Sequence, residues 1–181
     1  MISYRQHPIL LEQSSRAYYE GRLRCAKGIR VSNRSALEAD HYLIYVDGET
    51  KKGPGNDSSL NEEEAQTCID TLRWMTQVKQ IPMDDIVILT PYKAQKNHLN
   101  KLLNEIKGCN TVAHTGDTFQ GSEAEYVIIS LVKTVKEGAK VNENNQRLRF
   151  INDHRRTNVL LTRAKKGCII ICQDRAMEAS P

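Results

Sequence analysis

The sequence of 181 residues lacks a loop that would cradle the phosphates of a nucleotide. Residues 48–53 (Gly-Glu-Thr-Lys-Lys-Gly) have the glycine spacing of such a loop, but Pro54 and Gly55 stand where a lysine and a magnesium-binding hydroxyl are required. No helix is expected directly after them. We interpret the segment as a flexible connector without phosphate chemistry of its own.

Long hydrophobic runs are also lacking. The longest, residues 126–132 and 169–171, are far too short to cross a bilayer, and no basic-then-apolar leader opens the sequence. Hydrophobic residues make up 39% and charged residues 27%, an ordinary balance for a soluble chain of one domain with its own core. We therefore expect one soluble domain, located in the cytoplasm or the nucleus.

The five cysteines are scattered, and their odd number favours reduced thiols inside a cell. Cys168 and Cys172 lie four residues apart in an apolar strand, so both should point to the same side. No second Cys/His pair stands at zinc-finger spacing. We interpret the two as buried small hydrophobic side chains and predict no metal site.

Positive charge is concentrated in one part of the chain. Residues 133–166 contain ten Lys or Arg against three Asp or Glu and so carry +7, whereas the whole chain carries +4 and the remainder therefore −3. Such a zone suits a polyanion, either nucleic acid or the phosphates of ATP. For residues 136–145 a solvated loop is the favoured alternative.

Apolar strands alternate with amphipathic helices. Asn61 is expected to cap a helix with three glutamates in its first turn, and Gly108 to end the next helix in a left-handed conformation. This alternation predicts an α/β fold in which a parallel sheet is covered by helices on both faces and binds ligands beyond the carboxyl ends of its strands. The expected strands are 42–47, 86–90, 111–115, 126–132 and 168–172, and further helices are expected at 8–20 and 153–164.

Arg156 and Arg163 are seven residues apart, which is two helical turns, so both are expected to project from one face of the last helix. An arginine at a phosphoryl-transfer site offers a permanently charged fork that matches phosphate oxygens. A solvent-facing basic helix is the ordinary alternative for such a pair.

Four segments resemble motifs of superfamily 1 helicases, motor proteins that use ATP to move along RNA or DNA, and they follow one another along the chain in the order that this family has. Residues 117–125 (Asp-Thr-Phe-Gln-Gly-Ser-Glu-Ala-Glu) resemble motif V and residues 155–164 (Arg-Arg-Thr-Asn-Val-Leu-Leu-Thr-Arg-Ala) motif VI. Residues 88–95 (Ile-Leu-Thr-Pro-Tyr-Lys-Ala-Gln) are similar to motif IV. Residues 4–8 (Tyr-Arg-Gln-His-Pro) resemble the Tyr-Arg-Met-His-Pro element of up-frameshift-type helicases, the superfamily 1B group that includes senataxin.

The resemblance implies a RecA-like fold, which is the fold of P-loop NTPases, here without its own P-loop. Residues 1–181 would be the second RecA-like domain of a longer, two-lobed helicase. A first lobe of the same polypeptide would supply the P-loop lysine, the magnesium ligands and the acid that positions water. ATP with Mg²⁺ is then the implied cofactor and single-stranded RNA or DNA the implied partner, and the isolated chain is expected to be inactive.

The resemblance also implies roles for individual residues. Arg5 and Arg163 match two arginines that reach the γ-phosphate, and we expect their guanidinium groups to converge at one place on the rim of the sheet. The expected catalytic residues are Arg5, Arg163 and Gln120. The expected nucleotide-binding residues are Tyr4, Gly121, Glu123 and Arg156. Of these, Tyr4 matches an aromatic beside the adenine. Asn158 is expected to help order the cleft. The expected nucleic-acid-binding residues are Thr90, Pro91, Tyr92 and Thr118.

Ordinary structural roles compete with these assignments. Tyr4 and Tyr92 also suit half-buried aromatic positions, and Thr90 followed by Pro91 also suits the end of a strand. The rival function is a non-catalytic, helicase-like scaffold that binds nucleic acid or protein. The sequence departs from the motifs at Gln6, Ser122 and residues 114–116, and none of these departures removes a phosphate-facing group.

Overall fold

The computed structural model describes residues 2–3, 15–16, 20, 22, 24–25, 41–54, 58–135 and 153–178. Its centre is a five-stranded sheet in the order β3-β9-β8-β6-β7, in which every neighbouring pair is parallel. Two short strands, β1 (Ile2–Ser3) and β2 (Arg24–Cys25), form a separate parallel pair. The strands of the central sheet are β3 (His41–Tyr45), β6 (Ile86–Thr90), β7 (Ala113–Thr115), β8 (Ala124–Ser130) and β9 (Ala164–Cys172).

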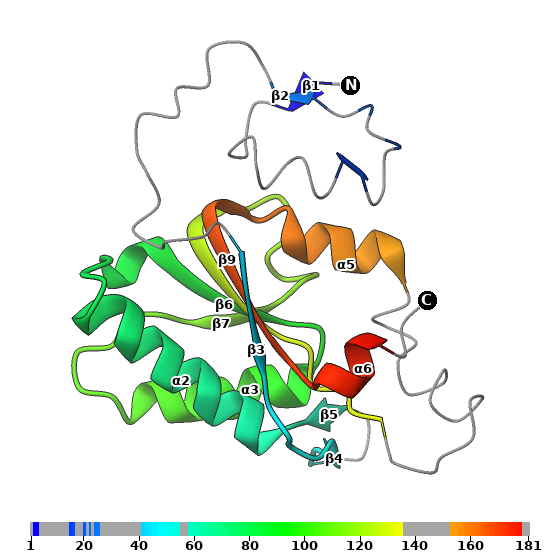
Figure 1. Cartoon of the computed structure of the whole chain (residues 1–181). Coiled ribbons are helices and arrows are strands. Elements are labelled where there is room, and N and C mark those ends of the chain that lie inside the picture. Colours follow the sequence, from blue (N-terminus) through cyan, green and yellow to red (C-terminus); the bar gives the residue numbers. More distant parts are fainter. Residues whose placement is uncertain are drawn as a thin grey trace.

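Helices cover both faces of this sheet (Figure 1). The helices α2 (Glu62–Gln77) and α3 (Lys93–Asn104) lie together on one face, and α5 (His154–Leu161) lies on the other. A short helix, α6 (Asp174–Glu178), follows β9. The predicted α/β architecture of RecA type, with a parallel sheet between helices, is confirmed.

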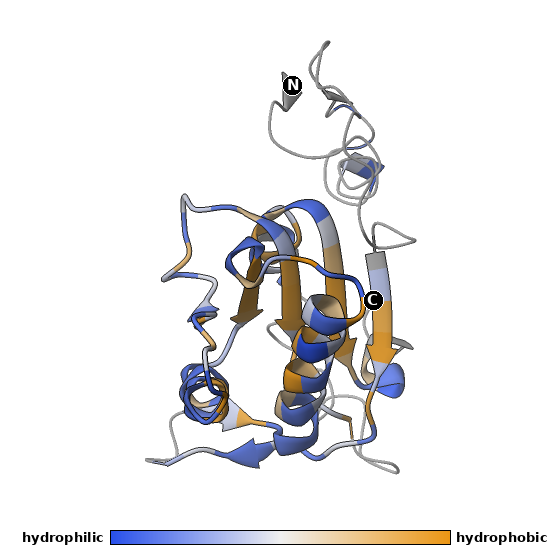
Figure 2. Cartoon of the chain, turned by 90° about the vertical axis from the view of Figure 1, so that its left-hand side faces the viewer, coloured by the Kyte–Doolittle hydropathy of each residue, from blue (hydrophilic) through white to orange (hydrophobic). Residues whose placement is uncertain are grey.

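Side chains of β8 alternate between the two hydrophobic cores because successive residues of a strand point to opposite faces. Tyr126 and Ile128 pack in the core beneath α2 and α3, whereas Val127 and Ile129 pack in the core beneath α5. The strand is therefore apolar along its whole length, as buried parallel strands are. Figure 2 shows the hydrophobic strands between helices whose outer surfaces are hydrophilic.

Several local predictions are confirmed. Strand β6 has the predicted bounds, and the side chain of Asn61 caps α2 by accepting a hydrogen bond from the Glu64 backbone N–H at 3.0 Å. Gly108 has φ +76°. Cys168 and Cys172 are both buried in the core beneath α5, and burial raises the pKa of each thiol to about 12.

Three segments differ from the prediction. Residues 48–59, expected as a loop, contain β4 (Lys51–Lys52), which pairs antiparallel with β5 (Ser59–Leu60). A 3₁₀ helix, η1 (Met83–Asp85), precedes β6. β8 and β9 begin earlier than their apolar runs, at Ala124 and Ala164, because these residues pair with each other through the backbone. Backbone pairing leaves no mark on hydropathy, so the sequence did not reveal it.

The β4–β5 hairpin packs closely against the first turn of α3. Ser58 Oγ accepts a hydrogen bond from the backbone N–H of Ala94 at 3.0 Å. A β-carbon on Gly53 would lie only 2.4 Å from the β-carbon of Ala94, so the hairpin can approach the helix only with glycine at this position. The predicted helix at 8–20 lies outside the described residues, except that Ser15 and Arg16 are helical. No helix within the described ranges is long and apolar enough to span a membrane.

Candidate functional site

A cavity of about 190 Å³ lies where the three C-terminal motifs meet. Its walls come from the loop after β6, the segment after β7 and the exposed part of α5. Three residues predicted from the sequence, Pro91, Gln120 and Arg156, line it together. The complete lining is Pro91, Gly116, Asp117, Gln120, Arg156, Val159 and Leu160.

The end of β6 forms the first wall. Thr90 pairs in register with Thr115 of β7, so both strands end at the same edge of the sheet. Thr90 is fully buried, and its hydroxyl accepts a hydrogen bond from the Tyr92 backbone N–H at 3.4 Å. The Thr90 side chain therefore shapes the turn into α3, whereas Pro91 and Tyr92 are the partly exposed residues of this predicted group.

Basic side chains surround Tyr92. The Nζ of Lys133 lies 5.1 Å from the centre of the Tyr92 ring. Burial raises the pKa of the Tyr92 hydroxyl, and the positive charge of Arg156 acts in the opposite direction. Arg156 also pairs with Asp153 on the first turn of α5, with 3.4 Å between Nε and Oδ2. An aromatic ring near two cations is a suitable surface for a nucleic-acid strand.

Thr118 lies on the second wall, in a turn that begins where β7 ends. The Thr115 backbone N–H donates to Thr118 Oγ1 at 2.9 Å, and the Thr118 N–H donates to Thr115 Oγ1 at 3.3 Å. Between two exposed residues, Phe119 is buried in the core. These bonds fix Thr118 at the carboxyl edge of the sheet, the edge that also carries Pro91.

The remaining motif V residues lie at the opposite edge. Gly121, with φ +83°, and Glu123 directly precede β8, and Glu123 pairs with Lys165 at 2.7 Å. These two residues therefore do not lie beyond the carboxyl end of a strand, where the sequence predicted that ligands bind. Because β7 and β8 both run parallel to β6, the chain must cross from one edge of the sheet to the other between them.

Arg163 lies beyond the end of α5, so the expectation that it projects from one helix face with Arg156 is wrong. It is buried, with 8% of its surface exposed. Its Nε donates to the Val159 carbonyl oxygen and its Nη1 to the Ser122 carbonyl oxygen, both at 3.1 Å. The guanidinium thus joins α5 to the segment before β8.

Tyr4 and Arg5 lie outside the described residues, and so does the basic segment at 136–152. The convergence of Arg5 with Arg163 stays a prediction. Within the ranges that the structure describes, no three His, Cys, Asp or Glu side chains gather as a metal site would require.

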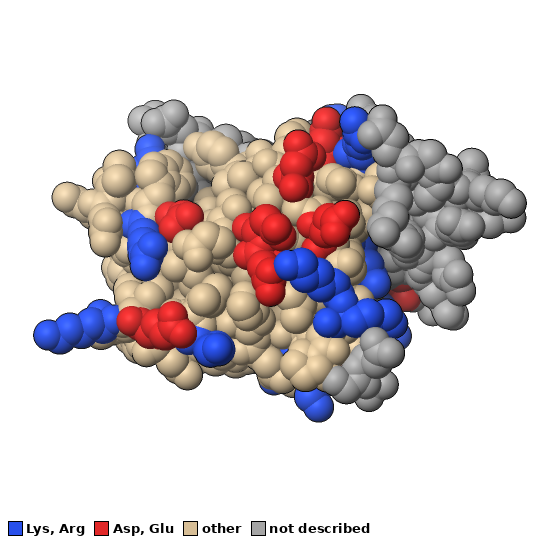
Figure 3. All heavy atoms as spheres, turned by 90° about the horizontal axis from the view of Figure 1, so that it is seen from below, with Lys and Arg blue, Asp and Glu red and all other residues tan. Residues whose placement is uncertain are grey.

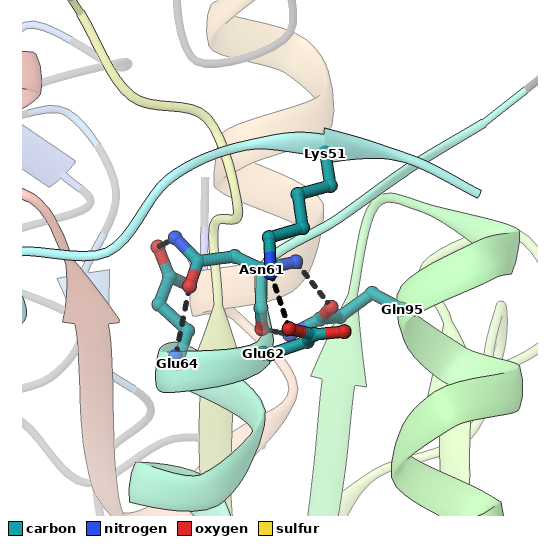
Figure 4. Close-up of polar contacts among 5 residues, drawn as sticks. All are labelled: Lys51, Asn61, Glu62, Glu64 and Gln95. Atoms are coloured by element: carbon teal, nitrogen blue, oxygen red, sulfur yellow. Dashed lines mark hydrogen bonds and ion pairs between the residues drawn. The ribbon is translucent and has the colours of Figure 1, made fainter.

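A buried polar cluster at the start of α2 was missed from the sequence (Figure 4). Glu64, predicted only to complement the dipole of α2, is fully buried and accepts hydrogen bonds from Ser130 Oγ at 2.7 Å and the Val132 N–H at 2.9 Å. Burial raises its pKa to about 7, although both hydrogen bonds act to lower it. Its neighbour Glu62 instead pairs with Lys51 of the hairpin.

Gln95, the last residue of the segment that resembles motif IV, completes this cluster. Its side chain accepts from the Asn61 N–H at 2.8 Å and donates to the Asn61 carbonyl oxygen at 3.0 Å and to Ser130 Oγ at 3.1 Å. Its place in the segment that resembles motif IV was the only feature of the sequence that indicated a role for Gln95. The cluster ties the first turn of α3 to the start of α2 and the end of β8.

Comparison with known proteins adds sequence relatives. The family model described as "AAA domain" (AAA_12) matches residues 1–175. The ATP-dependent helicase upf1 of Schizosaccharomyces pombe is 31% identical over 187 residues, which cover 94% of this chain and 19% of that protein. Helicase SEN1 of Saccharomyces cerevisiae is 26% identical over 196 residues, which cover 99% of this chain and 8% of that protein. The chain thus spans a fifth or less of the length of these relatives.

A solved structure has a similar fold. The C-terminal domain of a possible DNA helicase from Lactobacillus plantarum WCFS1 superimposes with a TM-score of 0.53 at 11% identity. The superposition covers 94% of this chain and 87% of that domain. At this identity the similarity concerns the fold alone.

Proposed function

The chain belongs to the Upf1-like superfamily 1B helicases, and on that premise we propose that it is the second motor lobe of an ATP-dependent helicase. The cavity carries this proposal, because Pro91, Gln120 and Arg156 come from three separate motifs and line one site. A first lobe of the same polypeptide supplies the phosphate-binding loop that this sequence lacks.

The amino edge of the sheet, where the parallel strands begin, is the side that we assign to ATP. Gly121, Glu123 and Arg163 precede β8 and β9 there, and Arg5 is the second arginine of the proposed set. When the lobes close, Arg163 exchanges a neutral carbonyl partner for a phosphate, which is the stronger acceptor. Its fixed charge then stabilises the charge that develops during hydrolysis.

The carboxyl edge is the side that we assign to single-stranded RNA or DNA. Pro91, Tyr92 and Thr118 lie there with Arg156, on elements whose positions are fixed by the sheet and by α5. The strand is held mainly through its phosphates, so the affinity falls as salt rises. Opening and closing of the two lobes during ATP hydrolysis then moves the protein along the strand.

A two-part ATPase measurement tests the proposal. The purified chain of 181 residues is expected to hydrolyse no ATP, because it lacks the phosphate-binding loop, whereas the full-length protein hydrolyses it in the presence of nucleic acid. ATP hydrolysis by the isolated chain contradicts the proposal that the ATP site is shared between two lobes. Absence of turnover in the full-length protein contradicts the motor.

The burial of Arg163 favours a second candidate, a helicase-like scaffold in which this arginine only joins elements within the lobe. A scaffold binds nucleic acid or protein without turnover. In that case Arg163→Ala lowers the stability of the domain, and it changes no ATPase activity because the unsubstituted protein has none. The sequence of the adjoining lobe separates the candidates, because only a motor requires a lysine-containing phosphate loop.

A further inference from the structure

The chain makes an unusual turn directly after β8. Val132 has φ +70°, and the Lys133 N–H donates to the carbonyl oxygen of Leu131 at 2.8 Å, which together define a γ-turn of the rarer kind. A positive φ is costly for a β-branched residue, and such strain persists only where the surroundings enforce it. Strained backbone of this kind concentrates at functional sites, so the turn calls for an explanation.

Glu64 holds the turn. Its carboxylate accepts the Val132 N–H at 2.9 Å and is itself fully buried, with Ser130 as its other close partner. Gln95 donates to the same Ser130 hydroxyl, so the turn is also connected to the first turn of α3. A buried carboxylate 68 positions away in the sequence therefore sets the backbone of Val132.

The turn directs Lys133 toward the predicted nucleic-acid surface. Its Nζ lies over the ring of Tyr92 and donates to Ser59 Oγ of the hairpin at 2.7 Å. Tyr92 follows Pro91, which lines the cavity, and the charge of Arg156 also reaches its hydroxyl. Lys133 and Arg156 thus place two cations around one aromatic ring.

Among the described residues of this face, Lys and Arg side chains do not form a uniform basic patch, so individual cations matter here. Seen from the side of the β4–β5 hairpin, Lys and Arg side chains lie next to Asp and Glu side chains (Figure 3). Lys51, for example, is paired with Glu62. A phosphate is attracted here by a cation held at a defined place, and Lys133 is held by two independent contacts.

We propose that Lys133 binds a phosphate of the nucleic-acid strand beside Tyr92, and that Glu64 is the positioning residue that sets Lys133 through the turn at Val132. The inference rests on the proposed function, since it adds a contact to the same nucleic-acid surface. It differs in its residues, because neither Lys133 nor Glu64 belongs to the motif-derived site.

Salt-dependent binding tests the proposal. The full-length protein, without nucleotide, is titrated with fluorescently labelled oligo-uridine and oligo-thymidine over a range of salt concentrations. Lys133→Gln is expected to weaken binding roughly three- to tenfold and to lower the slope of log K against log salt by about 0.7, the share of one phosphate on a single strand. Lys79→Gln is the matched control, since Lys79 lies over an aromatic ring, that of Trp74, at 5.3 Å.

Two further variants test the positioning role. Glu64→Gln is expected to lower the slope as Lys133→Gln does, and the double variant to lower it no further. An unchanged slope in Glu64→Gln shows that Glu64 acts only on stability, and additive losses show that it acts independently of Lys133; either result overturns its assigned role. Ser59→Ala removes the hydroxyl partner of Lys133 but keeps the charge, so it is expected to keep the full slope. Thermal melts establish that each variant is folded. If Glu64→Gln is misfolded, Ser130→Ala replaces it. A salt slope of Ser130→Ala equal to that of the wild type then overturns the positioning role of Glu64.

The outcomes separate this proposal from the function on which it rests. If the wild-type protein shows no salt-dependent binding to either oligonucleotide, the nucleic-acid function and this inference both fail. If the wild-type protein binds and Lys133→Gln keeps the wild-type affinity and slope, only the inference fails.

Discussion

The Nη1 of Arg163 lies 3.1 Å from the carbonyl oxygen of Ser122, 41 residues earlier in the chain. This hydrogen bond joins the segment that leads into β9 to the segment that leads into β8. The two strands are neighbours, and the Ala124 N–H donates to the Arg163 carbonyl oxygen at 3.0 Å. The side chain proposed to reach the γ-phosphate is therefore held in the lobe by both its guanidinium and its backbone.

Arg163→Ala should abolish most ATP hydrolysis by the full-length protein. The expected fall in rate is roughly 10³-fold, as for other arginines that stabilise transferred phosphoryl groups, with little change in nucleotide affinity. Steady-state turnover and nucleotide titration measure the two effects. Arg73→Ala, on the exposed surface of α2, is the control and should keep the full rate. An unchanged rate in Arg163→Ala removes the residue from catalysis.

Gly53→Ala should destabilise the domain. The added β-carbon would meet the β-carbon of Ala94 at 2.4 Å, so the hairpin must move away from α3. We expect the free energy of unfolding to fall by about 1–3 kcal/mol, the usual cost of overpacking, as measured by urea denaturation. Adding Ala94→Gly should restore part of the loss. Equal stability of Gly53→Ala and the wild type would show that the hairpin is not held closely against the helix.

The stability of the chain should depend on the titration of Glu64. Its pKa of about 7 lies above the ordinary value of 4.5, so the folded state favours the protonated acid. The stabilisation is therefore complete below about pH 4.5 and is lost as the pH rises through 7. Relative to Glu64→Gln, the wild type should lose on the order of 3 kcal/mol between about pH 5 and pH 8.

Glu62→Gln is the control for this pH series. Glu62 lies on the same turn of α2, but its hydrogen bond and ion pair with Lys51 lower its pKa. Its stabilising effect is lost only as the pH falls below the ordinary range, so the difference between this variant and the wild type should stay constant over the same window. Parallel curves for Glu64→Gln and the wild type would show that the buried carboxyl titrates at an ordinary pH.

Tyr92 should contribute to nucleic-acid binding through its ring. Tyr92→Ala is expected to weaken binding to a labelled oligo-uridine by about 1–3 kcal/mol, the usual value for one aromatic residue that stacks on a base. Tyr92→Phe should keep most of the affinity because it keeps the ring. A loss of equal size in both variants would instead assign the effect to the hydroxyl.

Local patterns predicted the elements of the fold well. Asn61 followed by glutamates predicted the start of α2, and the run Ile-Val-Ile-Leu-Thr predicted the bounds of β6. These features depend on neighbours in the sequence. The burial of Glu64 was missed because it depends on Ser130 and Val132, which only the folded sheet brings close.

The motifs gave Pro91, Gln120 and Arg156 three different roles and did not predict that these residues lie together. Pro91, Gln120 and Arg156 do line one cavity. Arg163 was placed on the last helix by its spacing from Arg156, but α5 ends at Leu161. A helical period continues in the sequence even after the helix has ended, so spacing alone could not show that limit.

The connection between β7 and β8 has a mechanical consequence. Thr118 anchors one end of it beside Thr115, and Arg163 clamps the other end at Ser122. Gly116, the residue after β7, packs closely on α5, since a β-carbon there would lie 3.1 Å from the Leu160 side chain. Because both ends of residues 116–123 are held, a displacement at one end reaches the other, so the edge proposed to bind nucleic acid and the edge proposed to bind ATP are connected by one short piece of chain.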